Sequence, residues 1–286
     1  MSKIAVLGMG AMGSRMAIAL LDAQHEVTVW NRNLEKTKPL AIKGAKTAET
    51  PYLAVKNAEF IISMVQDDSA SQRIWLAKDG AIAGMSPDAI AIESSTLTVA
   101  WTKTLATELA KQDLAFLDAP VAGTRPQAET QQLIYFVGGD RAVFTQAEPI
   151  LRAMGSKINY LGATGNGMTV KLAVNSLFTI QVSAIAEMIG LLNQLGLDVT
   201  KAIEVISATP VCSPAAAMAA KAMVAGQFAP LFPLHLVEKD LKYALKTSQD
   251  FGVQLPLVAT TQEICHTAIQ QGYGNENITA IARLYQ

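Results

Sequence analysis

A glycine-rich turn near the start of the sequence restricts the fold more than any other feature. The apolar run Ile4-Ala5-Val6-Leu7 leads into Gly8-Met9-Gly10-Ala11-Met12-Gly13. Residues 14–21 then have helical spacing, and a second β-branched run, Val27-Thr28-Val29-Trp30, follows. A strand, a G-x-G-x-x-G turn, a helix and a strand in this order are typical of a dinucleotide-binding unit, in which the turn approaches the pyrophosphate. The alternative is a glycine turn that binds no ligand. We expect Gly8, Met9, Gly10, Ala11, Met12 and Gly13 to bind the cofactor.

The residues after the second strand bear on the choice of dinucleotide. NAD-binding units usually place Asp or Glu here to accept from the ribose 2′-hydroxyl. This chain has Asn31 and Arg32 instead, and its first carboxylate is Glu35. Arg32 offers a planar guanidinium to a 2′-phosphate, with Asn31 adding neutral hydrogen bonds and Lys36 a further positive charge. We therefore expect NADP in preference to NAD; the alternative is that Arg32 is an ordinary solvated charge.

Apolar runs and helical patterns continue to alternate as far as Leu161. We expect further strands at 60–65, 89–92, 115–117, 135–137 and 157–160, the last at an edge, with helices near 68–75, 98–112 and 142–154. Gly138-Gly139-Asp140 reads as a turn. Regular alternation predicts a parallel sheet covered by helices, with the ligand crevice at the carboxyl ends of the strands.

Polar side chains follow two of these strands. Val65 and Gln66 end one strand, and Ser95 and Thr96 follow the next. Their position favours contact with the cofactor, and the two hydroxyls suit the nicotinamide amide or its ribose. The alternative for Ser95 and Thr96 is to cap the helix that begins near Thr98.

The strand at 115–117 is followed by Asp118-Ala-Pro120-Val-Ala122-Gly123-Thr124. Pro120 fixes its own φ and Gly123 frees the chain to turn. Such a turn can direct backbone N–H groups at a small anion such as a carboxylate. A plain loop explains the same residues.

From Gly165 onwards no segment reads as a strand. Residues 165–194 contain no proline, and as one helix they would extend roughly 40 Å. Further helices are expected at 199–207, 214–225, 236–251 and 257–270. We therefore expect a Rossmann α/β domain at residues 1–161 and an all-α domain at residues 162–286, joined by a long interdomain helix.

Lys171 and Asn175 lie four residues apart on that long helix and so share one face. Almost every neighbour is apolar, and burying an unpaired polar group costs several kcal/mol. This face is therefore a candidate site. The alternative is that Lys171 extends to solvent and Asn175 bonds a nearby loop. Lys239 and Asp240, taken by themselves, read as part of a solvated helix face.

Composition narrows the class of protein and its partners. The chain has 286 residues, is 50% hydrophobic and 16% charged, and carries a net charge of -1. This balance gives no electrostatic basis for binding nucleic acid or an anionic membrane. We expect Cys212 and Cys265 to form no metal or disulfide framework, and we expect no signal peptide, since the first strand begins directly after Met1-Ser2-Lys3. We expect a cytoplasmic protein with no metal and no membrane span, since polar residues interrupt the long apolar helix.

Four motifs together resemble the β-hydroxyacid dehydrogenase family, which includes 3-hydroxyisobutyrate dehydrogenases. They cover nearly the whole chain in order: Gly8-x-Gly10-x-Met12-Gly13, Asp118-Ala-Pro-Val-x-Gly123, Gly165-x-Gly167-x-x-x-Lys171-x-x-x-Asn175 and Lys239-Asp240-Leu241. The resemblance implies a Rossmann domain, an all-helical substrate and dimerisation domain, and a homodimer or homotetramer.

The resemblance also assigns roles to individual residues. It makes Lys171 the catalytic acid and base, and it places Asn175 and the segment Ala122, Gly123 and Thr124 against a small carboxylate-bearing substrate. Thr96 and Lys239 would lie against the nicotinamide and the substrate, and we count Asp240 with them as cofactor-binding. The family commonly has Ser at the position of Ala122, so this chain lacks one hydroxyl there, which Thr124 is placed to replace.

The function implied is interconversion of a small β-hydroxy acid and its aldehyde or keto acid by hydride transfer with NADP. The segment Gly123-Thr124-Arg125-Pro126 is similar to the glyoxylate and succinic semialdehyde reductase branch. An NADPH-dependent imine reductase is the first alternative: such relatives usually lack Lys at position 171, although Ala122 is compatible with one. A non-catalytic NADP-binding sensor is the second, and it would not need Lys171, Asn175 and Lys239 together.

Overall fold

The β-branched and apolar runs of the first half form one sheet in the computed structural model, which describes residues 1–285. Residue 286, the last of the expected helical domain, lies outside the described residues. The strands are β1 (Lys3–Leu7), β2 (Glu26–Trp30), β3 (Lys46–Thr47), β4 (Phe60–Ser63), β5 (Ile90–Glu93), β6 (Ala115–Asp118), β7 (Val121–Ala122), β8 (Leu133–Gly139) and β9 (Gly155–Tyr160).

The order of the strands is β3-β2-β1-β4-β5-β6-β8-β7, with β9 paired to β8. The six strands β3, β2, β1, β4, β5 and β6 are parallel to one another, as expected. Strand β8 runs antiparallel to both β6 and β7. The expected parallel sheet is confirmed for these six strands, and β8 departs from it at this end. The chain continues from β6 into β7 in the same direction and then reverses at a five-residue helix instead of crossing the sheet, so β8 returns in the opposite direction.

The glycine pair 138–139 belongs to β8 and not to a turn, which corrects the expected turn there. A Cβ on Gly138 would lie 2.6 Å from Oδ1 of Asp118, and one on Gly139 would lie 2.9 Å from the carbonyl oxygen of Phe116. Strand β8 can approach β6 this closely only because both residues lack a side chain.

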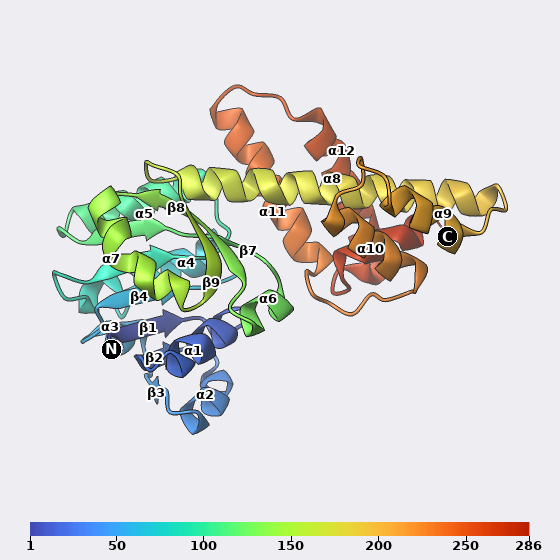
Figure 1. Cartoon of the computed structure of the whole chain (residues 1–286). Helices are drawn as coiled ribbons and strands as arrows, with labels where there is room; N and C mark the ends of the chain where they lie inside the picture. The colour runs from blue at the N-terminus through green and yellow to red at the C-terminus, as the bar shows by residue number, and fades with distance from the viewer. Residues whose placement is uncertain (286) are drawn as a thin grey trace. The chain divides into compact units, whose positions relative to one another are not determined.

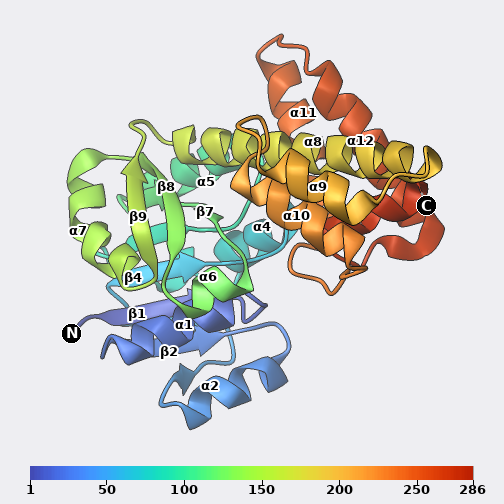
Figure 2. The ribbon, with the colours of Figure 1, turned by 45° about the vertical axis from the view of Figure 1, so that its right-hand side comes forward.

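Helices cover both faces of this sheet (Figure 1). They are α1 (Gly13–Asp22), α2 (Lys38–Ile42), α3 (Pro51–Val55), α4 (Asp68–Leu76), α5 (Val99–Ala110), α6 (Arg125–Glu129) and α7 (Arg141–Arg152). Successive side chains of a strand point to opposite faces, so Ile4 and Val6 pack with α1 and α7 while Ala5 and Leu7 pack with α3, α4 and α5. Figure 2 shows α7 lying beside β9.

The rest of the chain is helical, as expected. The helices are α8 (Asn166–Gln194), α9 (Val199–Ser207), α10 (Pro214–Val224), α11 (Leu234–Asp250) and α12 (Pro256–Ala268), followed by short turns at Ile269–Tyr273 and Ile278–Tyr285. Helix α8 has 29 residues and so extends about 43 Å. Its length and apolar composition would also fit a membrane span, a test that a core helix of a soluble protein passes equally.

Two compact units make up the chain, the first ending at Lys171 and the second beginning at Leu172. The expected boundary after Leu161 falls in the loop ahead of α8, whereas the units divide inside that helix. The first residues of α8 therefore belong with the unit that contains the sheet, because the carboxylate of Asp118 in β6 accepts hydrogen bonds from the backbone at the start of this helix.

Candidate functional site

The turn between β1 and α1 has the geometry that a pyrophosphate site requires. Gly8 has φ +107°, and a Cβ there would lie 2.3 Å from the carbonyl oxygen of Met64. A Cβ on Gly13 would lie 2.0 Å from the carbonyl oxygen of Gly8. At Gly10, in contrast, no atom lies within 4 Å of an added Cβ. Two glycines are thus needed by the protein itself, and the third borders open space.

The first turn of α1 fits an anionic group. Met12 precedes the helix and no side chain caps it, so N–H groups at this end remain available to a ligand. Together with the space at Gly10, this makes the turn a suitable cradle for a dinucleotide. Met9 is buried, and Ala11 and Gly10 are exposed at the turn.

Asn31, at the end of β2, braces this turn. Its Oδ1 accepts from the backbone N–H of Met9 at 2.9 Å, and its Nδ2 donates to the carbonyl oxygen of Asn33 at 2.8 Å. The side chain expected to contact a 2′-phosphate is thus also part of the scaffold of the glycine turn.

Arg32 and Lys36 are exposed, and within residues 1–285 neither side chain has an ion pair or a hydrogen bond. The nearest carboxylate, Glu35, pairs with Lys38 at 2.7 Å. Two unpaired cations therefore follow β2, where an NAD-binding unit would usually place an acid.

The turns that follow β4 and β5 lie side by side because those strands are neighbours. The hydroxyl of Ser95 accepts from the backbone N–H of Val65 at 2.8 Å. Thr98, and neither Ser95 nor Thr96, caps α5 by accepting from the N–H of Trp101 at 3.1 Å. The capping alternative is therefore wrong, and Thr96, half-buried, stays a predicted cofactor contact beside exposed Gln66.

Asp118, the last residue of β6, fixes the start of α8. It is fully buried, and its carboxylate accepts from the backbone N–H of Gly165 at 2.7 Å and of Met168 at 2.8 Å. Burial raises the pKa of Asp118 to about 6, against the opposing effect of these N–H groups. Lys171 follows Met168 by three residues and is buried, with 8% of its surface exposed. The alternative of a lysine extended into solvent is therefore wrong.

Sequence analysis did not single out Asp118 as a site residue. The signal was available, because a carboxylate at the end of a buried apolar strand must find donors. Its partners lie 47 and 50 residues further along the chain, so their identity was not visible in the local pattern.

The segment expected to bind a carboxylate begins in β7. Ala122 pairs with Ile134 of β8, and Gly123 has φ +122°, a conformation that favours glycine. The hydroxyl of Thr124 donates to Oε1 of Gln127 at 2.9 Å, as does its backbone N–H. Thr124 thus has a structural bond of its own, so it is not a simple substitute for the hydroxyl that Ala122 lacks.

In the second unit, Asn175, Lys239 and Asp240 come together. Nδ2 of Asn175 donates to Oδ2 of Asp240 at 2.6 Å, which joins α8 to α11. Nζ of Lys239 lies 2.8 Å from Oδ1 of Asp240 and 4.7 Å from the centre of the Tyr243 ring. Asp240 is only 4% exposed, so its assignment to a solvated face is wrong. Asn175 thus bonds a residue of helix α11, so the alternative that it bonds a nearby loop is wrong.

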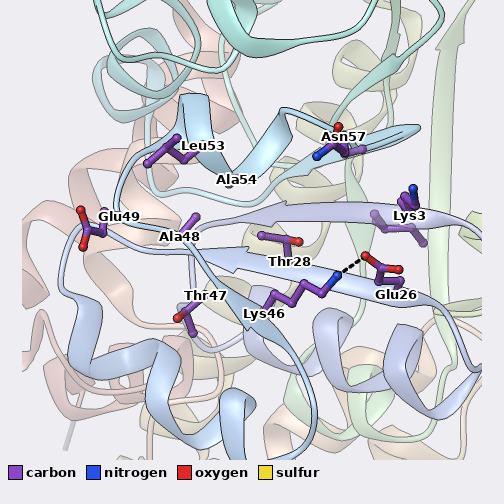
Figure 3. Close-up of a pocket in the computed structure, with 12 residues that line it drawn as sticks. Lys3, Glu26, Thr28, Lys46, Thr47, Ala48, Glu49, Leu53, Ala54 and Asn57 are labelled. Atoms are coloured by element: carbon purple, nitrogen blue, oxygen red, sulfur yellow. Dashed lines mark hydrogen bonds and ion pairs between the residues drawn. The ribbon is translucent and has the colours of Figure 1, made fainter.

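A separate groove of about 330 Å³ lies beside the first residues of β1 and β2, below α3 (Figure 3). Glu26 and Lys46 form an ion pair across it, and Thr28, Leu53 and Asn57 also line it. None of the predicted cofactor residues lines this groove. Among residues 1–285, no group of His, Cys, Asp and Glu side chains is arranged to hold a metal ion.

Comparisons with known proteins identify the family of this chain. Residues 3–162 match the NAD-binding domain of 6-phosphogluconate dehydrogenase, and residues 165–285 match the NAD-binding domain of NADP-dependent 3-hydroxyisobutyrate dehydrogenase. The chain is 33% identical to glyoxylate/succinic semialdehyde reductase 2 of Arabidopsis thaliana, over 97% of this chain and 78% of that protein.

Two further proteins are similar over almost their whole length. The 3-sulfolactaldehyde reductase of Escherichia coli K12 is 33% identical over 98% of this chain and 95% of its own. The structure of Mycobacterium tuberculosis 3-hydroxyisobutyrate dehydrogenase with L-serine superposes with a TM-score of 0.92 at 27% identity, covering 100% of this chain and 99% of that one. The chain therefore belongs to the β-hydroxyacid dehydrogenase family and is an NAD(P)-binding oxidoreductase that acts on hydroxyl and aldehyde groups.

Proposed function

We propose that this enzyme uses NADP(H) to interconvert a small β-hydroxy acid and its aldehyde, with Lys171 as the proton donor and acceptor. The observation that carries the proposal is the attachment of Lys171. It is buried one turn beyond the amides that Asp118 holds at the carboxyl end of β6. The glycine turn follows the carboxyl end of β1, a parallel strand of the same sheet that β4 and β5 separate from β6. The carboxyl ends of such strands are where dinucleotides and their substrates bind.

The bound nicotinamide supplies the hydride for reduction and accepts it in oxidation. The protein must then manage one proton and hold the substrate. In reduction the Lys171 ammonium donates a proton to the developing alkoxide oxygen, and in oxidation its neutral amine accepts the hydroxyl proton. The N–H groups of the turn at Gly123 bind the substrate carboxylate. For Asn175 and Lys239, substrate binding stays a prediction from the family resemblance.

The substrate class follows from the names of the relatives. Glyoxylate, succinic semialdehyde and sulfolactaldehyde are all small aldehydes that carry an acid group. We propose a substrate of that kind, because a turn of backbone N–H groups suits an anion. A panel of these three aldehydes with 3-hydroxyisobutyrate, 3-hydroxypropionate, serine and a cyclic imine, run with NADP and NAD, tests this. Turnover confined to the imine would contradict it.

Lys171→Ala tests the proton transfer. It is expected to lower kcat by about 10²- to 10⁴-fold while NADPH affinity stays nearly unchanged, since general acid–base groups contribute that much. Lys111→Ala is the control, because Lys111 pairs only with Glu108 on the surface of α5. A Lys171→Ala enzyme that keeps more than about a tenth of wild-type kcat would show that another group transfers the proton.

The preference for NADP rests on Arg32 and Lys36. Replacing Arg32 by Gln removes the planar cation, so the KM for NADPH is expected to rise about 10-fold or more while that for NADH changes little. Lys38→Gln is the matched control, because Lys38 is already paired with Glu35. Equal activity of the wild-type enzyme with NADH and NADPH would contradict the proposed preference for NADP.

We also propose that the enzyme is a homo-oligomer. Three exposed apolar side chains share one face of α8 at helical spacing: Leu177, Met188 and Leu191. A stripe of this kind commonly marks a protein interface. Leu191→Glu is expected to lower the mass measured by sedimentation, whereas Leu53→Glu on α3 is not. A monomeric wild-type enzyme would contradict the proposal.

A further inference from the structure

Glu93, the last residue of β5, has no exposed surface and no cation beside it. Its Oε2 accepts from the hydroxyl of Ser71 at 2.7 Å and from Nε1 of Trp75 at 2.8 Å. Its Oε1 accepts from the backbone N–H of Ser95 at 3.0 Å. A carboxylate in the centre of a domain is costly unless such partners hold it.

One arrangement of the protons makes every partner of Glu93 a donor. An indole N–H and a backbone N–H can only donate. The hydroxyl of Ser71 receives Nε1–H of Trp101 at 3.0 Å and can direct its own proton at Glu93. An ionised carboxylate accepts from all of these donors. Burial raises the pKa of Glu93, and these donors oppose that rise.

The network ends at the backbone of the turn after β4. The hydroxyl of Ser95 accepts from the N–H of Val65 at 2.8 Å, and the backbone N–H of Ser95 donates to Glu93 at 3.0 Å. A second link lies one turn further on, where Asp68 accepts from the N–H and the hydroxyl of Thr98 at 2.9 and 2.7 Å. The segments that follow the neighbouring strands β4 and β5 are thus joined by two sets of hydrogen bonds.

We propose that Glu93 is a positioning residue for the cofactor: through Ser95 it holds the turns at Val65-Gln66 and Thr96 as one rigid surface against which the dinucleotide binds. A role in core stability alone does not account for the arrangement, since apolar residues would fill the same space without burying a charge. The proposal rests on the proposed function in one respect, that the bound ligand is NADP(H).

Ser95→Ala is the decisive variant, and the neighbouring residue provides its control. Ser94 is equally buried, and its hydroxyl has no hydrogen-bond partner within the described residues. Ser95→Ala is expected to weaken NADPH binding about 10-fold, the equivalent of one hydrogen bond that organises the site. Ser94→Ala should stay within about twofold of the wild type, because no bond is lost.

NADPH binding is measured by fluorescence titration of the full-length protein without substrate, and kcat is then measured at saturating cofactor. We expect the KM for NADPH to rise in Ser95→Ala with little change in kcat. Glu93→Gln, which presents an amide N–H₂ to donors, should weaken binding further and lower Tm. If Glu93→Gln does not fold, Ser95→Ala still decides the matter.

Two results would overturn the inference while the proposed function stands. One is equal NADPH affinity in Ser95→Ala and Ser94→Ala when the wild type binds well. The other is a Ser95→Ala enzyme with lower Tm and unchanged NADPH affinity, which would assign the network to stability alone. A wild-type protein that binds neither NADPH nor NADP would instead overturn both.

Discussion

Replacing Asp118 by Ala tests whether the start of α8 is held by β6. The carboxylate accepts from backbone N–H groups of Gly165 and Met168 in a fully buried position. Alanine leaves these donors without an acceptor and opens no obvious path for water. Lys171 lies three residues beyond the last of them, so we expect both stability and catalysis to change.

The magnitude combines two opposing effects. Each buried donor left unsatisfied costs about 1–3 kcal/mol, so two cost about 2–6 kcal/mol. Burial that raises the pKa of Asp118 to about 6 represents a penalty for the ionised carboxylate of about 3 kcal/mol at pH 7 and about 1 kcal/mol at pH 4.5, which the variant no longer carries. The net loss in free energy of unfolding is therefore at most about 3 kcal/mol at pH 7 and about 1–5 kcal/mol at pH 4.5.

The pH dependence has a definite sign. A carboxyl whose pKa is higher in the folded protein than in the unfolded chain contributes stability that is fully present below the unfolded value near 3.9 and is lost as the pH rises through about 6. From pH 7 to pH 4.5 the wild type should gain about 2 kcal/mol from Asp118, and the Ala variant should not. The difference between the two proteins should thus widen in acid.

Thermal unfolding between pH 4.5 and 7.5, with kcat and NADPH affinity at pH 7, measures these effects. We expect about a 10-fold lower kcat with NADPH affinity nearly unchanged, because misplacing Lys171 affects the chemical step. Asp140→Ala is the control: Asp140 caps α7 by accepting from two N–H groups, so it should cost about 1 kcal/mol and leave kcat unchanged. An Asp118→Ala protein as stable as the wild type at pH 4.5, or a difference that narrows in acid, would refute the reasoning.

Gly10→Ala and Gly13→Ala should separate the two uses of glycine. A Cβ on Gly13 would overlap a carbonyl oxygen, so folding is impaired and Tm falls, whereas Gly10→Ala keeps the wild-type Tm and loses dinucleotide affinity. Differential scanning fluorimetry with and without NADPH distinguishes them, and normal NADPH binding by Gly10→Ala would contradict the assignment. In the second unit, Glu238→Gln should cost about 1–3 kcal/mol, since the carboxylate accepts from His266 on α12 at 2.8 Å. Burial opposes the charge, but Lys242 and His266 hold the pKa of Glu238 below its ordinary value. Its contribution should therefore vanish as the pH falls below about 4, where chemical denaturation should find variant and wild type equally stable.

Local signals predicted the elements well because they depend on neighbouring residues. Helix α9 begins and ends where the pattern places it, with Asp198 as its cap. Pro214 and Pro256 stand in the first turns of α10 and α12, where proline is favoured. The glycine turn predicts its own strand and helix for the same reason.

The direction of neighbouring strands and the hydrogen bonds between elements were harder to predict from the sequence. The antiparallel direction of β8 depends on its approach to β6, which Gly138 permits, and no pattern within β8 reports that. Ser95 bonds to Val65 across 30 residues of sequence, and Asp118 to Gly165 across 47. In both cases the partner is a backbone N–H, which every non-proline residue carries. The residue types therefore could not reveal the pairing.

The boundary between the two units falls inside α8, and this limits where the chain can be cut or joined to another protein. Its first turn needs Asp118 from the sheet, while the residues from Leu172 onwards belong to the helical unit. A break in the loop before the helix would strip the sheet of the segment that covers its buried aspartate. Domain exchange between relatives should therefore place the junction within the helix and keep residues 165–171 with the nucleotide-binding half.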